Sequence, residues 1–366
     1  MRRILKNISL ARYINLNIVY MTYLFNKWRY RKIVKLSDLT LPLNSNVLYV
    51  GTDEFQDKSG FLQDLGKLHN LYILENEVKY GQYHEFQLGP NNDRNCRFLN
   101  DKLKDLSEKN VNIDIVLMQS WARLWDIDLL SEIKKKFGFK IINICMDDRH
   151  SFLMPTFTSK YNRGTSGLIP VLDGALVSAK ECVNWYRSKD VKARYFPEAS
   201  SKDFFYKIPN IEKDIDVGFV GAKYGKRASY IEYLKASGVN VVCYGSGWEN
   251  GRLDNGSVNE IFNRCKIVLG FGFILDSVKF CALKLRDFDV PLSGSFYLTS
   301  FNEDLLELFP RKNKDHYFSS KGDMVKKVKY FLQNEAEREA IAEAIYLDAK
   351  KNHTYVSRFL ECSDET

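Results

Sequence analysis

Residues 283–309, LKLRDFDVPLSGSFYLTSFNEDLLELF, place Arg286 and Asp289 shortly before a Ser-Gly-Ser turn at 293–295. A guanidinium can bind a diphosphate through two parallel hydrogen bonds, and a carboxylate can accept hydrogen bonds from ribose hydroxyls. The backbone N–H groups of a glycine turn can bind a phosphate. Arg286 could equally form a structural ion pair with Asp287 or Asp289. The segment therefore predicts either part of a nucleotide site or a clamp between charged side chains.

A second candidate anion site follows the apolar run DVGFVG at 216–221, which we predict to be a strand. Gly221 leads into Lys223, Lys226 and Arg227, where a helical pattern starts. Glycine lets backbone N–H groups approach an anion, the helix N-terminus adds partial positive charge, and the cations complete the pocket. The spacing matches neither a P-loop nor Gly-x-Gly-x-x-Gly. An ordinary solvated turn is the alternative.

A third loop, GSGW at 245–248, closes another predicted strand, and its Trp248 could face a base or cap the core. Ligands of parallel sheets that are covered by helices bind at the carboxyl ends of the strands. Three such loops on one edge of a sheet would form a site for a nucleoside diphosphate. This interpretation also explains why residues 283–309 combine opposite charges.

The composition describes a globular protein too long for one ordinary core. The chain has 366 residues, of which 45% are hydrophobic and 27% are charged, so two domains are expected. Its seven cysteines show no Cys-x-x-Cys spacing and its five histidines show no ligand spacing. This pattern favours reduced thiols in the cytoplasm over a disulfide framework or a structural metal site.

The net charge of +8 belongs to one end of the chain. Residues 1–35 hold nine basic side chains and no acidic one, and the rest of the chain has 45 basic and 46 acidic residues. A nucleic-acid partner is therefore not expected, because its binding site would spread positive charge over a folded domain. The basic residues alternate with tyrosines, Phe25 and Trp28, a mixture typical of a membrane surface.

This amino-terminal segment is too polar to cross a bilayer. Its longest uncharged run, residues 13–26, has 14 residues, fewer than the roughly 20 that a spanning helix needs. No small-residue cleavage site marks it as a signal peptide. We expect a cytoplasmic protein that could lie peripherally at the inner face of the membrane. A basic helix packed on the body of the protein, or a frayed end, is the alternative.

From residue 46 onward, short apolar runs alternate with helical patterns, which predicts parallel sheets covered on both faces. The predicted strands are residues 46–51, 71–75, 113–118, 140–146 and 174–179, then 216–221, 239–245, 266–272, 294–299 and 315–320. A polar linker at 194–214 separates the two sets. We predict two doubly wound, Rossmann-like α/β domains that face each other across a cleft. The predicted parts are a basic segment at 1–36, domains at 37–195 and 205–335, and a helix at 336–366 that returns to the first domain.

Residues 216–358 resemble the CgeB-like, spore-maturation-type glycosyltransferases, which have the GT-B fold and are related to the retaining group-1/family-4-type enzymes. The resemblance rests on the order and spacing of several segments. These are DVGFVGAKYGKR, VCYGSGW, NRCKIVLGFG, LRDFDVPLSGSFYLT followed by EDLLELF, then EREAIA and HTYVSRF. The first half of the chain matches only in general pattern. The family commonly has Glu where this chain has Asp289, and retaining relatives often have Glu at the position of Cys281.

The resemblance implies a metal-independent transferase without a cofactor. Its donor, a nucleoside-diphosphate sugar, would bind the second domain, and a glycan, a lipid-linked glycan or a surface polysaccharide would bind the first as acceptor. Basic side chains would stabilise the departing diphosphate, and Asp289 would hold the ribose. The predicted donor-binding residues are Gly51, Thr52, Gly221, Lys223, Lys226, Arg227, Gly245, Gly247, Arg286, Asp289, Ser293, Gly294 and Ser295.

The segment MDDRH at 146–150 supplies the candidate catalytic groups. Asp147, Asp148 or His150 could orient the acceptor hydroxyl or act as its base. A helix cap or a strand-end turn would use the same residues. We expect His353 to be a packing or capping residue. A nucleotide-sugar epimerase and an inactive binding module remain as alternative functions, the second because of Cys281 and Asp289.

Overall fold

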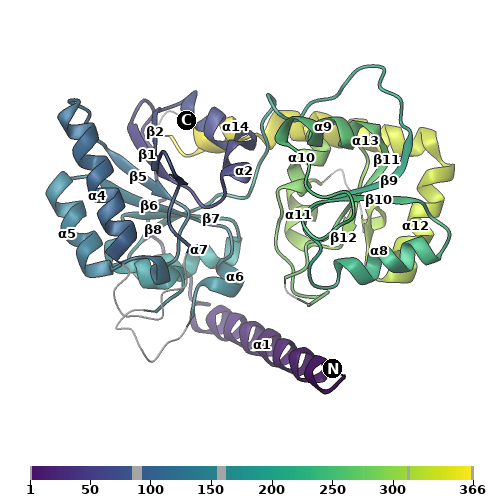
Figure 1. Ribbon diagram of the computed structural model, residues 1–366, viewed down its shortest axis with the longest axis horizontal. Coiled ribbons are helices and arrows are strands. Elements are labelled where there is room, and N and C mark those ends of the chain that lie inside the picture. Colours follow the sequence, from purple (N-terminus) through teal and green to yellow (C-terminus); the bar gives the residue numbers. More distant parts are fainter. Residues whose placement is uncertain (1, 85–92, 155–161, 275, 311–313, 364–366) are drawn as a thin grey trace. The chain divides into compact units, whose positions relative to one another are not determined.

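The structure is a computed structural model that describes residues 2–84, 93–154, 162–274, 276–310 and 314–363 (Figure 1). The chain folds as two compact α/β units, which are described separately. One unit comprises Val19–Pro197 with Arg358–Thr366, and the other comprises Met1–Ile18 with Glu198–Ser357. We call them the first and the second unit.

The first unit is built on a six-stranded parallel sheet of order β2-β1-β5-β6-β7-β8. Its strands are β1 (Asn46–Val50), β2 (Asn70–Ile73), β5 (Ile115–Met118), β6 (Lys140–Cys145), β7 (Gly174–Val177) and β8 (Lys192–Tyr195). A separate hairpin pairs β3 (Glu75–Asn76) with β4 (Lys79–Tyr80). The central strands are buried on both faces, as the apolar runs predict.

Alternate residues of these strands face two helical layers. Leu48, Val116 and Ile141 join α4 (Asp93–Glu108), α5 (Ile127–Phe137) and α7 (Lys180–Arg187) in one core. Helices α4 and α5 lie side by side (Figure 1). The Asp126 side chain accepts the Leu129 N–H at 3.0 Å where α5 begins, as an N-cap does. The short helices are α2 (Glu54–Gln56), η1 (Asp57–Phe61), α3 (Leu62–Gly66), η2 (Ala122–Leu124), α6 (Asp148–Ser151) and η3 (Thr165–Val171).

The second unit has a five-stranded parallel sheet of order β10-β9-β11-β12-β13. Its strands are β9 (Ile215–Val220), β10 (Val241–Tyr244), β11 (Cys265–Gly270), β12 (Tyr297–Ser300) and β13 (Tyr317–Phe318). One face packs on α8 (Arg227–Ala236) and α12 (Lys321–Gln333), and the other on α9 (Asn255–Arg264), α10 (Arg286–Leu292) and α13 (Glu335–Asn352). Two further helices are α11 (Glu303–Leu308) and η4 (Lys314–His316).

The end of the chain differs from the single helix that we predicted at 336–366. Helix α13 belongs to the second unit and ends at Asn352, and α14 (Tyr355–Glu361) starts after a break at His353 and Thr354. From Arg358 the chain belongs to the first unit, where the Phe359 ring packs on Phe61 at 5.7 Å. The predicted linker also began too early, because β8 occupies Lys192–Tyr195.

Helix α1 (Arg2–Arg29) carries most of the basic amino-terminal segment. Its carboxyl-terminal half packs on the first unit, where the Tyr23 hydroxyl donates to Glu181 Oε1 at 3.0 Å and the Tyr30 ring meets Phe152 at 6.0 Å. Within the described ranges, no helix combines the length and the apolar character that crossing a membrane requires.

Candidate functional site

Gly221 occupies a position that only glycine fits, at the carboxyl end of β9. Its φ is +151°, and a Cβ atom at this residue would lie 2.5 Å from Nη1 of Arg286. A side chain would therefore be strained by the backbone and would collide with a guanidinium. The sequence predicted that Gly221 and Arg286 serve one site, and the structure brings them into contact.

Arg286, the first residue of α10, has guanidinium N–H groups that no other described residue accepts. Its Nε and Nη2 atoms are buried without a hydrogen-bond partner, and the guanidinium carbon lies 5.1 Å from the centre of the Phe219 ring. In the described part of the chain, Arg286 forms no ion pair with Asp287 or Asp289. Asp287 instead accepts the Tyr297 hydroxyl and the Lys284 N–H, each at 2.7 Å. The clamp interpretation is therefore wrong.

Arg227, at the start of α8, is a second buried guanidinium in this region. Its Nη1 donates to the Ala222 carbonyl at 3.1 Å and its Nη2 to the Tyr224 hydroxyl at 2.9 Å, whereas Nε is buried without a partner. Burial, followed by the positive charge of Arg286, lowers the pKa of Arg227 to about 10. Two positive charges that are buried close together favour the binding of an anion. Such an anion would also accept hydrogen bonds from the N–H groups that lack an acceptor in the described structure.

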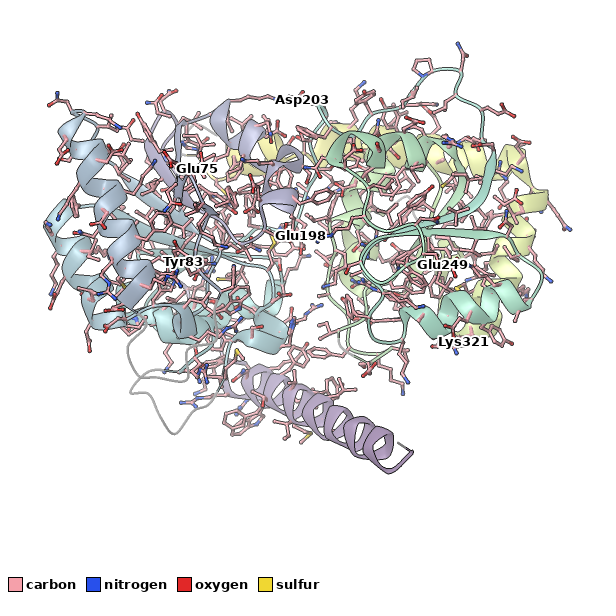
Figure 2. All side chains as sticks on the ribbon, in the orientation of Figure 1. Glu75, Tyr83, Glu198, Asp203, Glu249 and Lys321 are labelled. Atoms are coloured by element: carbon pink, nitrogen blue, oxygen red, sulfur yellow. The ribbon has the colours of Figure 1, made fainter. Side chains whose placement is uncertain are left out.

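The loops after β9 and β10 support this region as one unit. The Lys223 N–H donates to the Ser246 carbonyl at 2.8 Å, and the indole N–H of Trp248 donates to the Gly221 carbonyl at 2.8 Å. Gly245 has φ +126°, and a Cβ there would lie 2.4 Å from the Gly221 carbonyl oxygen. Trp248 thus fixes the Gly221 carbonyl by a hydrogen bond, so its role is structural. Exposed Glu249 follows it (Figure 2).

The remaining predicted residues of these loops lie at the rim. A Cβ at Gly247, whose φ is +86°, would lie 3.1 Å from the Lys223 Cβ. Lys223 and Lys226 are exposed, and Lys223 Nζ lies 4.9 Å from the centre of the Trp248 ring. Both amines are free to move toward an anion that the buried arginines hold.

Asp289 lies three residues after Arg286 and therefore on the same side of α10. Its Oδ1 accepts the Ser200 hydroxyl at 2.7 Å, and burial raises the pKa of Asp289 to about 8. Ser200 is itself fixed, because its N–H donates to the His353 carbonyl and its carbonyl accepts the Tyr355 N–H. No sequence pattern pointed to Ser200, which lies in the predicted linker.

The Ser293-Gly294-Ser295 turn does not belong to this site, and that prediction is wrong. It precedes β12, so it lies at the amino edge of a parallel sheet whose carboxyl edge carries Gly221. The Ser293 hydroxyl donates to the Val290 carbonyl and the Ser295 hydroxyl to the Phe262 carbonyl, each at 2.7 Å. The turn ends α10 and fixes the entry into β12.

Gly51 and Thr52 end β1 in the first unit and pack on a buried carboxylate. The Thr52 N–H donates to Asp57 Oδ2 at 3.1 Å, the Tyr80 hydroxyl donates to the same oxygen at 3.0 Å, and a Cβ at Gly51 would lie 2.5 Å from it. The Thr52 hydroxyl donates to the Gln119 carbonyl at 2.7 Å. Burial raises the pKa of Asp57 to about 6. A role of Gly51 and Thr52 toward the donor stays a prediction.

Asp148 is a buried group and is poorly placed to meet an acceptor. Its Oδ1 accepts the hydroxyls of Thr165 and Tyr186, the second at 3.0 Å, while Oδ2 is buried without a hydrogen-bond partner. Burial raises the pKa of Asp148 to about 7. This carboxyl group is buried with Thr165 and Tyr186, so its surroundings are those of a core residue.

Asp147 and His150 remain accessible candidates for work on an acceptor. Asp147 caps α6 without a side-chain hydrogen bond to the helix, and its Oδ1 lies 3.6 Å from His150 Nε2. Asp147 also lines a cavity of about 10 Å³, room for about one water molecule, with Gln119, Ser120 and Trp121. Asp147 thus occupies the N-cap position of α6, as the alternative interpretation predicted. A catalytic role of Asp147 or His150 stays a prediction.

Asp148→Asn should flatten the pH dependence of stability. Since the pKa of Asp148 is raised from 3.8 to about 7 in the folded state, the stability that this group contributes is fully present below the unfolded pKa. It is lost as pH rises through this window. The loss amounts to roughly 4 kcal/mol at most. Urea unfolding across the window should show a smaller decline for the variant. Exposed Asp101→Asn on α4 is the control, and equal declines in all three proteins would contradict this explanation.

His353 has the packing role that the sequence predicted. Its Nε2 is 2.9 Å from the Leu308 carbonyl oxygen, and its ring lies 4.3 Å from the Phe309 ring. Both contacts are to α11 and the residue after it. His353 therefore fixes the end of α13 in the second unit.

Comparison with known proteins finds a family match in the second half of the chain. A family model described as glycosyl transferase-like matches residues 227–363, a range that begins at Arg227 and includes Arg286. No curated protein matches the chain.

Solved structures resemble the whole chain in fold. Anabaena HepE in complex with UDP and glucose has a TM-score of 0.60 and 7% identity, covering 87% of this chain and 98% of that one. A sucrose-phosphate synthase from Thermosynechococcus elongatus has a TM-score of 0.58 and 8% identity, and the match covers 86% of this chain and 96% of that one. A glycosyltransferase from Rickettsia africae has a TM-score of 0.57 and 11% identity, and the match covers 87% of this chain and 96% of that one. This protein therefore has the GT-B fold of two Rossmann-like α/β units, as the sequence predicted.

Proposed function

We propose that this protein is a glycosyltransferase that moves a sugar from a nucleoside-diphosphate donor to a glycan or a lipid-linked acceptor. The main support is Arg286, which lies beside Gly221. Its Nε and Nη2 atoms are buried and have no hydrogen-bond partner among the described residues. A buried donor without a partner costs about 1–3 kcal/mol, so a ligand that satisfies it gains that energy. The glycosyl transferase-like match over residues 227–363 and the GT-B fold support the same reading.

The diphosphate would lie between Arg286 and Arg227, with Lys223 and Lys226 closing over it from the rim. During transfer, the bond between the anomeric carbon and the diphosphate oxygen breaks and the diphosphate leaves with the electron pair. An acceptor hydroxyl forms the new bond to that carbon and loses its proton. Fixed cations that meet the developing charge need no reorganisation, which is the main source of catalysis in such a site.

Asp289 is our candidate for holding the ribose. The Ser200 hydroxyl donates to its Oδ1 at 2.7 Å and fixes the orientation of the carboxyl group. In the first unit, Asp147 and His150 are our candidates for orienting the acceptor hydroxyl. The sequence resemblance to CgeB-like enzymes favours retention at the anomeric carbon and synthesis of a polysaccharide as the setting.

Incubation with a series of sugar nucleotides tests the proposal. We expect slow release of the nucleoside diphosphate without an acceptor and faster release when lipid-linked or soluble glycans are added, followed by chromatography of the nucleotides. Accumulation of an isomeric sugar nucleotide without any release would show an epimerase instead. If nucleotides bind and no sugar nucleotide is consumed, the chain is a binding module.

We also propose that α1 lies on a membrane surface, peripherally at the cytoplasmic face. Met21, Phe25 and Trp28 repeat at helical spacing and are 47% to 63% exposed, among basic residues. Aromatic and basic side chains together are typical of the headgroup region. The full chain should float with vesicles that contain anionic lipid, and recovery in the soluble fraction alone would contradict this.

A further inference from the structure

A pocket of about 350 Å³ lies in the first unit between the carboxyl-terminal end of α1 and the helix η3. Its lining includes Tyr30, the residue after α1, Phe152, the residue after α6, and Ile169 from η3. Phe152 is buried against the aromatic core, with its ring 5.1 Å from that of Trp185. Figure 1 shows the carboxyl-terminal end of α1 beside this part of the unit. The floor is therefore apolar and rigid.

Two basic side chains and one buried hydroxyl group line the same pocket. Arg29 and Lys189 are exposed, and neither forms an ion pair within the described residues. The Arg29 guanidinium carbon lies 5.5 Å from the Tyr30 ring centre, which holds it at the rim. The Ser166 hydroxyl oxygen is buried and finds no hydrogen-bond partner among the residues that the structure describes. An apolar floor with two unpaired cations and an unsatisfied hydroxyl suits the phosphate of an amphiphile.

Arg31 caps one carbonyl group at the carboxyl-terminal end of α1. Arg31 donates from Nη1 to the Trp28 carbonyl at 2.8 Å, and its N–H donates to the same carbonyl. Both hydrogen bonds go to one carbonyl group of the last turn, where the helix dipole is negative. They reduce the partial negative charge beside Arg29.

The exposed apolar face of α1 continues from this pocket. Phe25 lies one turn before Arg29, with its ring centre 5.9 Å from the Arg29 guanidinium carbon, and Trp28 is 61% exposed. A lipid whose phosphate lies between Arg29 and Lys189 would have apolar side chains beside its acyl chains. A soluble phosphate would use only the rim.

We infer that this pocket binds the phosphate headgroup of an anionic membrane phospholipid, which fixes α1 and the first unit on the bilayer. The inference rests on the membrane-surface partner proposed above and gives that partner a specific site. It is independent of the nucleotide site, which lies in the second unit.

Flotation of the full chain with vesicles tests the site. The vesicles contain phosphatidylcholine alone or phosphatidylcholine mixed with phosphatidylglycerol. We expect Arg29→Ala and Lys189→Ala each to lower partition onto the anionic vesicles about fivefold, the usual contribution of one basic residue near such a surface. Ile169→Trp, which fills the pocket and keeps its charges, should lower it by a similar factor. Lys135→Ala, an exposed residue of α5, should match the wild type.

Three results would overturn the inference. Equal losses for Lys135→Ala and Lys189→Ala would show diffuse attraction without a site, and wild-type binding by Ile169→Trp would show that the pocket is not used. If the full chain does not float with anionic vesicles while inorganic phosphate stabilises the wild type but not Arg29→Ala, the site takes free phosphate. Stabilisation by nucleoside diphosphates should survive in every variant, so a failure here is distinguishable from failure of the donor site.

Discussion

Arg286→Met should abolish most transfer activity while making the ligand-free protein more stable. The wild type keeps the Nε and Nη2 atoms of Arg286 buried without hydrogen-bond partners. Removing such groups relieves about 1–3 kcal/mol, which would raise the unfolding midpoint by several degrees. The same change deletes a preorganised donor to the departing diphosphate, so the rate should fall about 10²–10³-fold. Turnover of a sugar nucleotide and thermal unfolding measure the two effects.

Arg264→Met is the matched control for this variant. Arg264 lies in the same unit and pairs with Asp214 at 2.6 Å on the exposed surface. Its loss should leave the rate unchanged and change stability by less than about 1 kcal/mol. An Arg286→Met enzyme with the wild-type rate would show that the diphosphate binds elsewhere. A large loss of stability in Arg286→Met would show that this arginine is structural.

Gly221→Ala should lose nucleotide binding, and Gly238→Ala should not. Both glycines have positive φ, +151° and +83°, so alanine is strained by about 1–2 kcal/mol at either position. The surroundings differ, because nothing lies within 4 Å of a Cβ at Gly238, whereas a Cβ at Gly221 would be 2.5 Å from Arg286 Nη1. The Gly221 variant must therefore displace the guanidinium.

Calorimetric titration with a nucleoside diphosphate separates the two effects of these glycine variants. We expect Gly238→Ala to bind like the wild type despite its lower unfolding midpoint. We expect Gly221→Ala to bind at least tenfold more weakly, because a bidentate charged contact is lost. Equal affinities for the two variants would mean that the position of Arg286 does not matter to the ligand.

The sequence predicted the parallel sheets well because their strands are buried on both faces. The runs that became β5 and β11 contain almost only apolar residues, and such runs leave little choice of structure. It missed β8, whose KARY mixes charged and aromatic residues at the edge of the sheet. It also merged α13 with α14, because the helical pattern continues across His353 while tertiary contacts of Ser200 with the backbone of His353 and Tyr355 interrupt it.

The candidate site was predictable where residue type dictates geometry. Gly221 was found because a glycine after a strand lets backbone N–H groups approach an anion, and Arg286 because a guanidinium can bind a diphosphate through two hydrogen bonds. The Ser293-Gly294-Ser295 turn was misplaced because nearness in sequence to Arg286 hid the helix between them, which carries the chain to the other sheet edge. The burial of Asp148 could not be predicted, because it depends on Tyr186 and Thr165, which are distant in sequence.

Thermal unfolding of the wild type and Arg286→Met against UDP, GDP, ADP, CDP and dTDP tests the donor site most directly. A ligand at about a hundred times its dissociation constant adds roughly 2.7 kcal/mol to the native state. For a domain of this size, that amounts to a rise of about 5–10 °C. We predict that one nucleotide raises the midpoint of the wild type and leaves that of Arg286→Met unchanged. Stabilisation of both proteins by the same amount, or of neither by any nucleotide, would contradict the assignment of Arg286 to a nucleoside-diphosphate site.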